Sequence, residues 1–221
     1  GRAVVEPPKE VRQDWWIIQE IAKRMGLGWD YKSPKDIFDE MKLVMPSLDN
    51  ISWERLEKDN HVTYPVKSEL IPGEDIIFTN GFPTSNNLAK IIPVNLINPN
   101  DELNSDFPLI LSTGRLLEHW HTGTMTRRAL VLNELEPDPM IFMNKVDSNF
   151  YNLNLNKSVI IETRRGKISI KIRHDDDLLP GMIFLPFCFK EAAANILTNS
   201  DLDPIGKIPE LKFSAARVYQ N

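Results

Sequence analysis

Apolar positions recur along the chain with two periods, the first typical of helices and the second of strands. Near the beginning the spacing is helical, and it predicts a helix over 15–25 that Asp14 caps and Gly26 ends. Its apolar face is expected to hold Trp15, Ile18, Ala22 and Met25. We interpret this tryptophan-rich face as a packing surface and not as a cofactor site.

Two further helices are predicted in this first third of the chain. Ser33-Pro34 is a typical helix start, with serine as the cap and proline in the first turn, and Pro46 ends that helix. Its apolar face would consist of Ile37, Phe38, Met41 and Val44. A short helix is predicted to follow Ser52.

From about residue 65 the pattern shortens to the alternation of strands. Runs at 76–78 and 90–92 around Asn86-Asn87 predict a hairpin, and Arg165-Gly166 predicts a turn between two strongly alternating strands. The predicted strands beyond residue 100 are 109–112, 140–143, 158–164, 167–172, 182–185 and 215–219. Short helices are expected at 146–153 and 190–197. Many short strands separated by turn residues are typical of a barrel or a sandwich.

The segment 112–128, which follows one of these strands, is dense in groups that bind anions. It carries five hydroxyl side chains, three arginines and two of the four histidines of the chain. Gly114 and Gly123 allow close approach of the backbone or positive φ. Hydroxyls, guanidinium groups and free backbone N–H groups are the donors that a phosphate-bearing ligand requires, so this strand exit is a candidate binding site.

Composition excludes several classes of protein. A net charge of −5 argues against a general nucleic-acid binder, and the single cysteine, Cys188, excludes an internal disulfide or a cysteine-ligated zinc or iron–sulfur site within these 221 residues. The longest apolar run, 182–189, is interrupted by Pro186 and is too short to span a bilayer. The chain opens without an initiator methionine, so we expect a fragment or an expression product with its tag removed. The lone cysteine favours a reducing compartment, and we expect the cytoplasm.

Several motifs together resemble one family. The sequence from Phe107 to Arg128, FPLILSTGRLLEHWHTGTMTRR, resembles the C-terminal domain of molybdopterin-dependent oxidoreductases, and so do Arg164-Arg165-Gly166 and the stretch from Pro186 to Thr198. The likeness extends over nearly the whole chain and is greatest to the formate dehydrogenase catalytic (alpha) subunit, with nitrate reductases next. The Phe-Lys-Glu-Ala-Ala-Ala-Asn version of the late motif favours formate dehydrogenase.

The resemblance implies a mainly β fold, a six-stranded double-psi β-barrel over 101–221, preceded by a helical and short-strand segment over 1–100 from the end of the preceding domain. It implies binding of molybdopterin guanine dinucleotide with molybdenum or tungsten. The implied cofactor-binding residues are Thr113, Gly114, Arg115, Leu116, Leu117, Glu118, His119, Trp120, His121, Thr122, Phe187, Asn195 and Lys212. Asn195 is expected at a helix end, in one pocket with His119.

The resemblance implies that this chain is the cofactor-binding part of an oxidoreductase that oxidises formate to CO2. The implied partners are the upstream catalytic half of the same subunit and electron-transfer subunits. No residue here is expected to be catalytic or to bind the metal, because the family's metal-ligating cysteine or selenocysteine and its iron–sulfur cysteines have no counterpart. The isolated chain is therefore expected to be catalytically silent. A nitrate reductase-like subunit and a non-catalytic cofactor-binding or assembly module remain alternatives.

Four groups have simpler interpretations. His119 and His121 would share a face on a strand and could bind one metal, which with Glu118 as base would make a metal hydrolase, but no third ligand is within sequence reach. Asp175-Asp176-Asp177 is interpreted as a solvated turn, and Cys188 as a small buried hydrophobe. For Arg127-Arg128, surface charge and phosphate contact both stay open.

Overall fold

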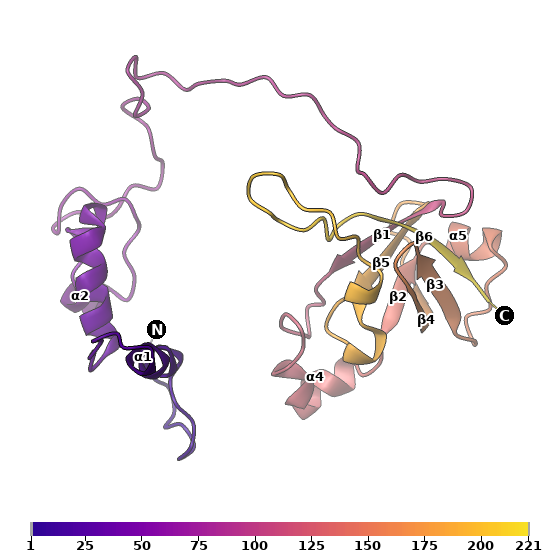
Figure 1. Cartoon of the computed structure of the whole chain (residues 1–221), viewed down its shortest axis with the longest axis horizontal. Helices are drawn as coiled ribbons and strands as arrows, with labels where there is room; N and C mark the ends of the chain where they lie inside the picture. The colour runs from indigo at the N-terminus through magenta and orange to yellow at the C-terminus, as the bar shows by residue number, and fades with distance from the viewer. Residues whose placement is uncertain (1, 221) are drawn as a thin grey trace. The chain divides into compact units, whose positions relative to one another are not determined.

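The computed structural model describes residues 2–220 and divides the chain into two compact units, Gly1–Pro93 and Val94–Asn221. In the first unit, α1 (Asp14–Arg24), α2 (Pro34–Val44) and α3 (Trp53–Asp59) form near the predicted positions, with the 3₁₀ turn η1 (Pro46–Leu48) between the last two (Figure 1). Ser33 and Asp36 form a capping box at the start of α2, and Ser52 caps α3. These local starts follow directly from side chains that satisfy the first backbone N–H groups.

The predicted packing face of α1 is right for Ala22, which is buried, and for Trp15, which is half-buried, but wrong for Ile18 and Met25. Ile18 and Met25 are 57% and 76% exposed, whereas Gln19 and Ala22 are buried. The Gln19 amide accepts a hydrogen bond from the Tyr31 backbone N–H at 2.6 Å and donates to its carbonyl at 3.1 Å. This polar pairing turns the Gln19 side of the helix toward the chain that follows it. In α2 nothing is fully buried, although Phe38 contacts Trp53 of α3 at 6.0 Å between ring centroids.

The predicted hairpin between 76–78 and 90–92 is also wrong, because neither run is a strand in the described structure. The turn at its centre does form: the Phe82 N–H donates to the Asn87 carbonyl, and Asn87 adopts φ 58°. The flanking apolar side chains, such as Ile76 and Ile91, are exposed. Turn residues alone therefore formed the turn without pairing the chain on either side of it.

The second unit is a closed six-stranded barrel, which confirms the predicted fold class (Figure 1). The strands are β1 (Leu109–Gly114), β2 (Met140–Met143), β3 (Val159–Thr163), β4 (Lys167–His174), β5 (Met182–Pro186) and β6 (Ser214–Tyr219). Their order around the barrel is β1-β5-β2-β4-β3-β6, and the β1–β5 and β2–β4 pairs are parallel. Closure leaves no sheet edge unpaired along this ring.

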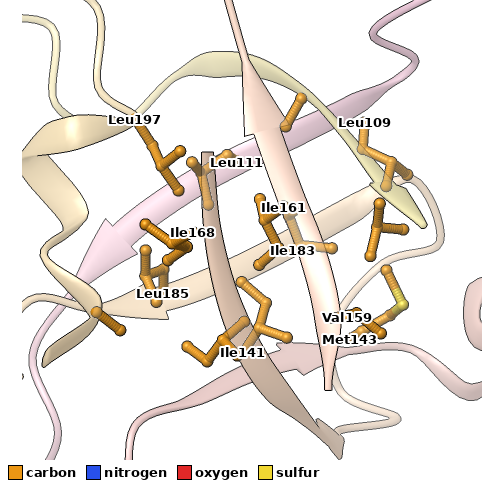
Figure 2. Close-up of a cluster of buried hydrophobic side chains, with 14 of the residues drawn as sticks. Leu109, Leu111, Ile141, Met143, Val159, Ile161, Ile168, Ile183, Leu185 and Leu197 are labelled. Atoms are coloured by element: carbon orange, nitrogen blue, oxygen red, sulfur yellow. The ribbon is translucent and has the colours of Figure 1, made fainter. Parts of the chain in front are cut away.

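Period-two alternation places the core inside this barrel. Inward side chains of all six strands, including Leu111, Ile141, Ile161 and Ile183, form one buried apolar cluster (Figure 2). Outward positions on β4 are exposed in alternation with buried ones, as the sequence predicts.

Short helical segments connect the strands. They are η2 (Thr126–Arg128), α4 (Leu130–Leu135), α5 (Lys145–Phe150), η3 (Lys190–Ala192) and η4 (Ala194–Ile196). The sequence did not predict α4, and the helix predicted at 190–197 is split at the extended residue Ala193. Ala192 and Ala194, on either side of it, are both buried in the barrel cluster. Residues i and i+2 point to the same side only where the backbone is extended, so a continuous helix could not bury both. None of the helices formed by residues 2–220 has the length and apolar character needed to cross a bilayer.

Candidate functional site

The exit of β1 is held rigidly against the late part of the chain. A Cβ at Gly114 would lie 2.4 Å from Cε2 of Phe184, so only glycine fits beside this ring. The Thr113 hydroxyl donates to the Leu211 carbonyl at 2.7 Å, and the Lys212 ammonium donates to the Thr113 carbonyl. Segments about a hundred residues apart in the sequence therefore meet where the β1 loop begins.

A cavity of about 560 Å³ opens at this junction. The β1 exit loop, the segment after β5 and the residues before β6 each supply part of its wall. The lining residues are Thr113, Arg115, His121, Thr122, Thr124, Phe187, Phe189, Lys190, Ala193, Ala194, Asn195, Leu211 and Lys212. Cationic and hydroxyl groups thus face an apolar, partly aromatic surface, a combination that suits an anionic ligand with a flat ring system.

Phe187 is the aromatic centre of that surface. The Arg115 guanidinium carbon lies 5.7 Å from its ring centroid, and the His121 ring meets it edge-on at 5.7 Å. His121 is held with φ 52°, an uncommon conformation for a residue other than glycine. The cation and the imidazole are therefore positioned on a common aromatic ring at the cavity.

His119 is buried, only 1% exposed, and does not line the cavity. Its Nε2 lies 2.7 Å from the Glu136 carbonyl oxygen, which can only accept, so Nε2 carries the proton. Nδ1 lies 3.3 Å from the Thr126 hydroxyl, whose oxygen also accepts from the Trp120 N–H. The ring packs edge-on against Phe189, a wall residue of the cavity, at 5.6 Å. His119 therefore packs behind the cavity wall, and the prediction that it shares one pocket with Asn195 is wrong.

The expectation that His119 and His121 share a face holds only on a strand, and this segment is not a strand. One imidazole is buried and the other lies at the cavity, because the chain turns at His121. Among residues 2–220 no group of three or more His, Cys, Asp or Glu side chains is arranged to hold a metal. The metal-hydrolase interpretation of this motif loses its geometric basis.

The other residues implied by the resemblance are distributed unevenly around the loop. Thr113, Arg115, His121, Thr122, Phe187, Asn195 and Lys212 line the cavity. Leu117 and Trp120 are 97% and 62% exposed, and neither they nor Gly114, Leu116 and Glu118 line it. Six lining residues are not among those implied by the resemblance: Thr124, Phe189, Lys190, Ala193, Ala194 and Leu211. Of these, Thr124 lies within the segment 112–128 that the sequence indicated as a candidate binding site. A local signal existed for Lys190, a lone cation directly after an apolar run.

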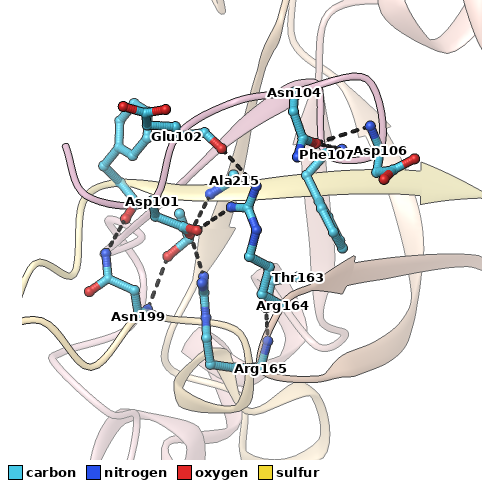
Figure 3. Close-up of polar contacts among 12 residues, drawn as sticks. Asp101, Glu102, Asn104, Asp106, Phe107, Thr163, Arg164, Arg165, Asn199 and Ala215 are labelled. Atoms are coloured by element: carbon cyan, nitrogen blue, oxygen red, sulfur yellow. Dashed lines mark hydrogen bonds and ion pairs between the residues drawn. The ribbon is translucent and has the colours of Figure 1, made fainter. Parts of the chain in front are cut away.

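A polar cluster forms around Asp101, with Arg164, Arg165 and Ala215 as its partners (Figure 3). The Asp101 carboxylate is buried; it pairs with Arg164 and with Arg165 (2.7 Å) and accepts from the Ala215 N–H at 2.8 Å. Burial alone would raise the pKa of Asp101, but the hydrogen bonds from Arg165, Ala215 and Arg164 hold it below its ordinary value.

The same cluster holds the chain just after Asn195. Arg165 and the Thr163 hydroxyl both donate to the Leu197 carbonyl, at 3.1 and 2.9 Å. Gly166 is required in this turn, since a Cβ there would lie 2.7 Å from the Ile196 side chain. The Arg-Arg-Gly turn thus fixes the backbone that carries Asn195 to the cavity.

Cys188 lies beside the cavity walls but is only 1% exposed. Burial raises the pKa of its thiol. A buried, protonated thiol is a poor nucleophile and a poor metal ligand, in agreement with the structural role predicted from its apolar neighbours.

Comparison with known proteins gives this site a family. The family described as "Molydopterin dinucleotide binding domain" matches residues 109–215. The F420-dependent formate dehydrogenase subunit alpha of Methanocaldococcus jannaschii is 38% identical over 219 residues, 98% of this chain and 32% of that protein. Formate dehydrogenase H of Escherichia coli is 30% identical over 217 residues, 97% of this chain and 30% of that protein.

A solved structure agrees in fold. Acetylene hydratase from Pelobacter acetylenicus superposes with a TM-score of 0.67 at 21% identity, covering 100% of this chain and 34% of that one. At that identity the likeness shows the fold alone. The chain spans about a third of the length of the relatives that it matches. Residues 109–215 are therefore a molybdopterin dinucleotide-binding domain, within a chain that is formate dehydrogenase-like over nearly its whole length.

Proposed function

We propose that the 560 Å³ cavity is the surface on which this domain holds molybdopterin guanine dinucleotide, as part of a formate dehydrogenase-like oxidoreductase. The observation that carries the proposal is that Arg115, Lys212 and Asn195 line one cavity together with Phe187, inside a domain of the dinucleotide-binding family. The cations would bind the phosphates, and the Asn195 amide would bind a pterin or guanine edge.

The residues present fit such a group. Gly114 packs tightly against the Phe184 ring next to the cavity residue Thr113, and the cavity wall offers cations, hydroxyls and an amide in one place. When bound, the cofactor supplies the metal-centred redox chemistry that protein side chains lack. The chain's own residues bind and orient the cofactor. Arg115 and Lys212 act through their charge, Thr113 and Thr122 through their hydroxyls in the cavity wall, and His119 by supporting the loop.

The activity of the whole protein is proposed from its relatives. Relatives named formate dehydrogenases favour formate oxidation, and the 38% identity to one of them exceeds the 29% identity to an assimilatory nitrate reductase catalytic subunit of Bacillus subtilis. The proposed partners are an upstream catalytic half, to which the helical unit 1–93 would connect, and electron-transfer subunits. A cytoplasmic location is part of the same proposal.

Isothermal titration calorimetry of the 221-residue chain with guanosine 5′-diphosphate tests the site. Arg115→Ala should weaken binding by about 10- to 100-fold, the value of one charge-assisted hydrogen bond. Leu117→Ala is the matched control from the same loop, because that side chain is 97% exposed and lies outside the cavity. Equal affinities for both variants and the parent chain would show that the nucleotide does not bind in this cavity.

An activity assay tests whether catalysis requires the upstream part of the protein. Cys188 is buried with a raised pKa, so we expect no metal-ligating thiolate from this chain. The isolated chain, supplied with molybdate, pterin cofactor, formate and an artificial electron acceptor, should show no turnover. Turnover above background would make the chain an enzyme by itself, and turnover only after an upstream polypeptide is added would support the split role.

A further inference from the structure

A second cavity, of about 340 Å³, adjoins the first, and Thr122 is the one lining residue that belongs to the positions implied by the family resemblance. The two share Thr122, Thr124 and Lys190 as a common rim. The rest of the wall of the second cavity comes from Gly123, Arg127, Arg128, Cys188 and Glu191. We call it the Arg127 cavity.

Its charge is strongly one-sided. Arg127, Arg128 and Lys190 supply three cations, and Glu191 is the one carboxylate among the lining residues. Arg127 Nη1 pairs with Glu191 Oε2 at 2.7 Å, and this bond holds the pKa of Glu191 below its ordinary value, so the carboxylate stays ionised. Two positive charges are left over in a chain whose net charge is −5.

Arg127 is held in place but incompletely bonded. Its guanidinium carbon lies 4.9 Å from the Phe189 ring centroid, and its stem lies so close to Gly123 that a Cβ there would come within 2.9 Å of it. The Nε–H group is buried and has no hydrogen-bond partner in the structure. A buried donor without an acceptor costs free energy, and a small shift of the side chain toward an oxygen of a bound anion would recover it.

We propose that the Arg127 cavity is a binding site for a phosphate-type oxyanion. Arg127 supplies the guanidinium donors, Lys190 and Arg128 supply charge, and the Thr122 and Thr124 hydroxyls complete the donor set. The oxyanion has two possible sources: free phosphate, or a phosphoryl group of a nucleotide that lies in the larger cavity and reaches across the shared rim. The second source rests on the proposed function, and the first does not.

The experiment titrates the ¹⁵N-labelled 221-residue chain with inorganic phosphate at constant ionic strength and measures the amide chemical shifts by NMR. The amide signals of Gly123, Thr124 and Lys190 should shift together. Arg127→Gln should weaken phosphate binding roughly tenfold, and Arg127→Lys should also weaken it, because lysine keeps the charge but not the Nε donor. Lys171→Gln is the charge control, since Lys171 is exposed on β4 and lies outside both cavities.

Three outcomes overturn the inference: no binding by the parent chain at millimolar phosphate, shifts confined to other parts of the chain, or an equal effect of Lys171→Gln and Arg127→Gln. If Arg127→Gln fails to fold, Lys190→Gln replaces it, because that side chain is exposed, and a several-fold loss is expected.

A competition arm separates the two sources. Guanosine 5′-diphosphate that displaces phosphate, with the same dependence on Arg127, assigns the site to a nucleotide's phosphoryl group. Simultaneous binding of both assigns it to free phosphate. Failure of Arg115→Ala to weaken the nucleotide, with Arg127→Gln still weakening phosphate, would remove the proposed function and leave this site standing.

Discussion

The helical unit and the barrel unit differ in where their apolar side chains lie. In the barrel, all six strands contribute to one buried cluster. Between residues 2 and 93, the buried hydrophobic side chains are Ala22, Ile51 and Val66, while Ile18, Leu43 and Val44 are more than half exposed. The two units therefore rest on different sources of stability.

The barrel is stabilised by long-range burial and by a closed hydrogen-bond ring, which no short segment of it could form alone. The helices are stabilised mainly by local contacts, such as the Ser33 capping box and the surface pair of Arg24 and Glu20 at 2.9 Å. Local contacts contribute little each, so the helical unit should be the easier one to open.

The largest expected contrast comes from one isoleucine in each unit. Ile183→Ala, at a position that is 0% exposed, should lower the free energy of unfolding of the barrel by about 2–5 kcal/mol, because it leaves a cavity in the core. Ile18→Ala, at a side chain 57% exposed, should change that of the helical unit by less than about 1 kcal/mol. Urea titrations read from the amide NMR signals of each unit measure both. Similar losses would mean that the units do not differ as described.

A smaller effect, still within the barrel, is expected at Asp101. Asp101→Asn leaves two arginines beside a neutral amide and should cost about 2–4 kcal/mol at pH 7. The folded pKa of Asp101 is lowered, so its stabilisation is complete above about pH 4 and is lost as the pH falls through that lowered pKa.

The difference between Asp101→Asn and the parent chain should therefore shrink below about pH 4. Urea midpoints at pH 7 and pH 3 measure it. Asp176→Asn, in an exposed turn of the same unit, is the control and should be within about 0.5 kcal/mol of the parent chain at pH 7. A gap that stays constant with pH would show that the carboxylate charge is not what stabilises this cluster.

The smallest effect is expected in the helical unit. Ser33→Ala removes the side-chain acceptor of the Asp36 N–H and should cost about 1 kcal/mol, confined to α2. Amide hydrogen exchange should accelerate in α2 roughly fivefold, with the barrel amides unchanged as internal reference. Faster exchange throughout the barrel would indicate that the two units are energetically coupled.

Much of the architecture follows from sequence alone, because the responsible interactions are local. Alternation predicted all six barrel strands to within two residues at their ends, and Ser33-Pro34 predicted the start of α2. Where a local pattern lacked a long-range partner, prediction failed: the runs at 76–78 and 90–92 have strand-like composition but do not pair, and the buried side of α1 was decided by the Gln19–Tyr31 hydrogen bonds.

The candidate site was decided mainly by tertiary structure. The sequence located the loop after β1, but it could not distinguish His119 from His121, two positions apart in one motif. The Glu136 carbonyl and the Phe189 ring bury the first, and a positive φ turns the second to the cavity. Lys190 and Lys212 join that loop only because the barrel brings the ends of β5 and the start of β6 beside β1. Which side of a loop a residue faces depends on partners far away in the sequence, and only the closed barrel determines them.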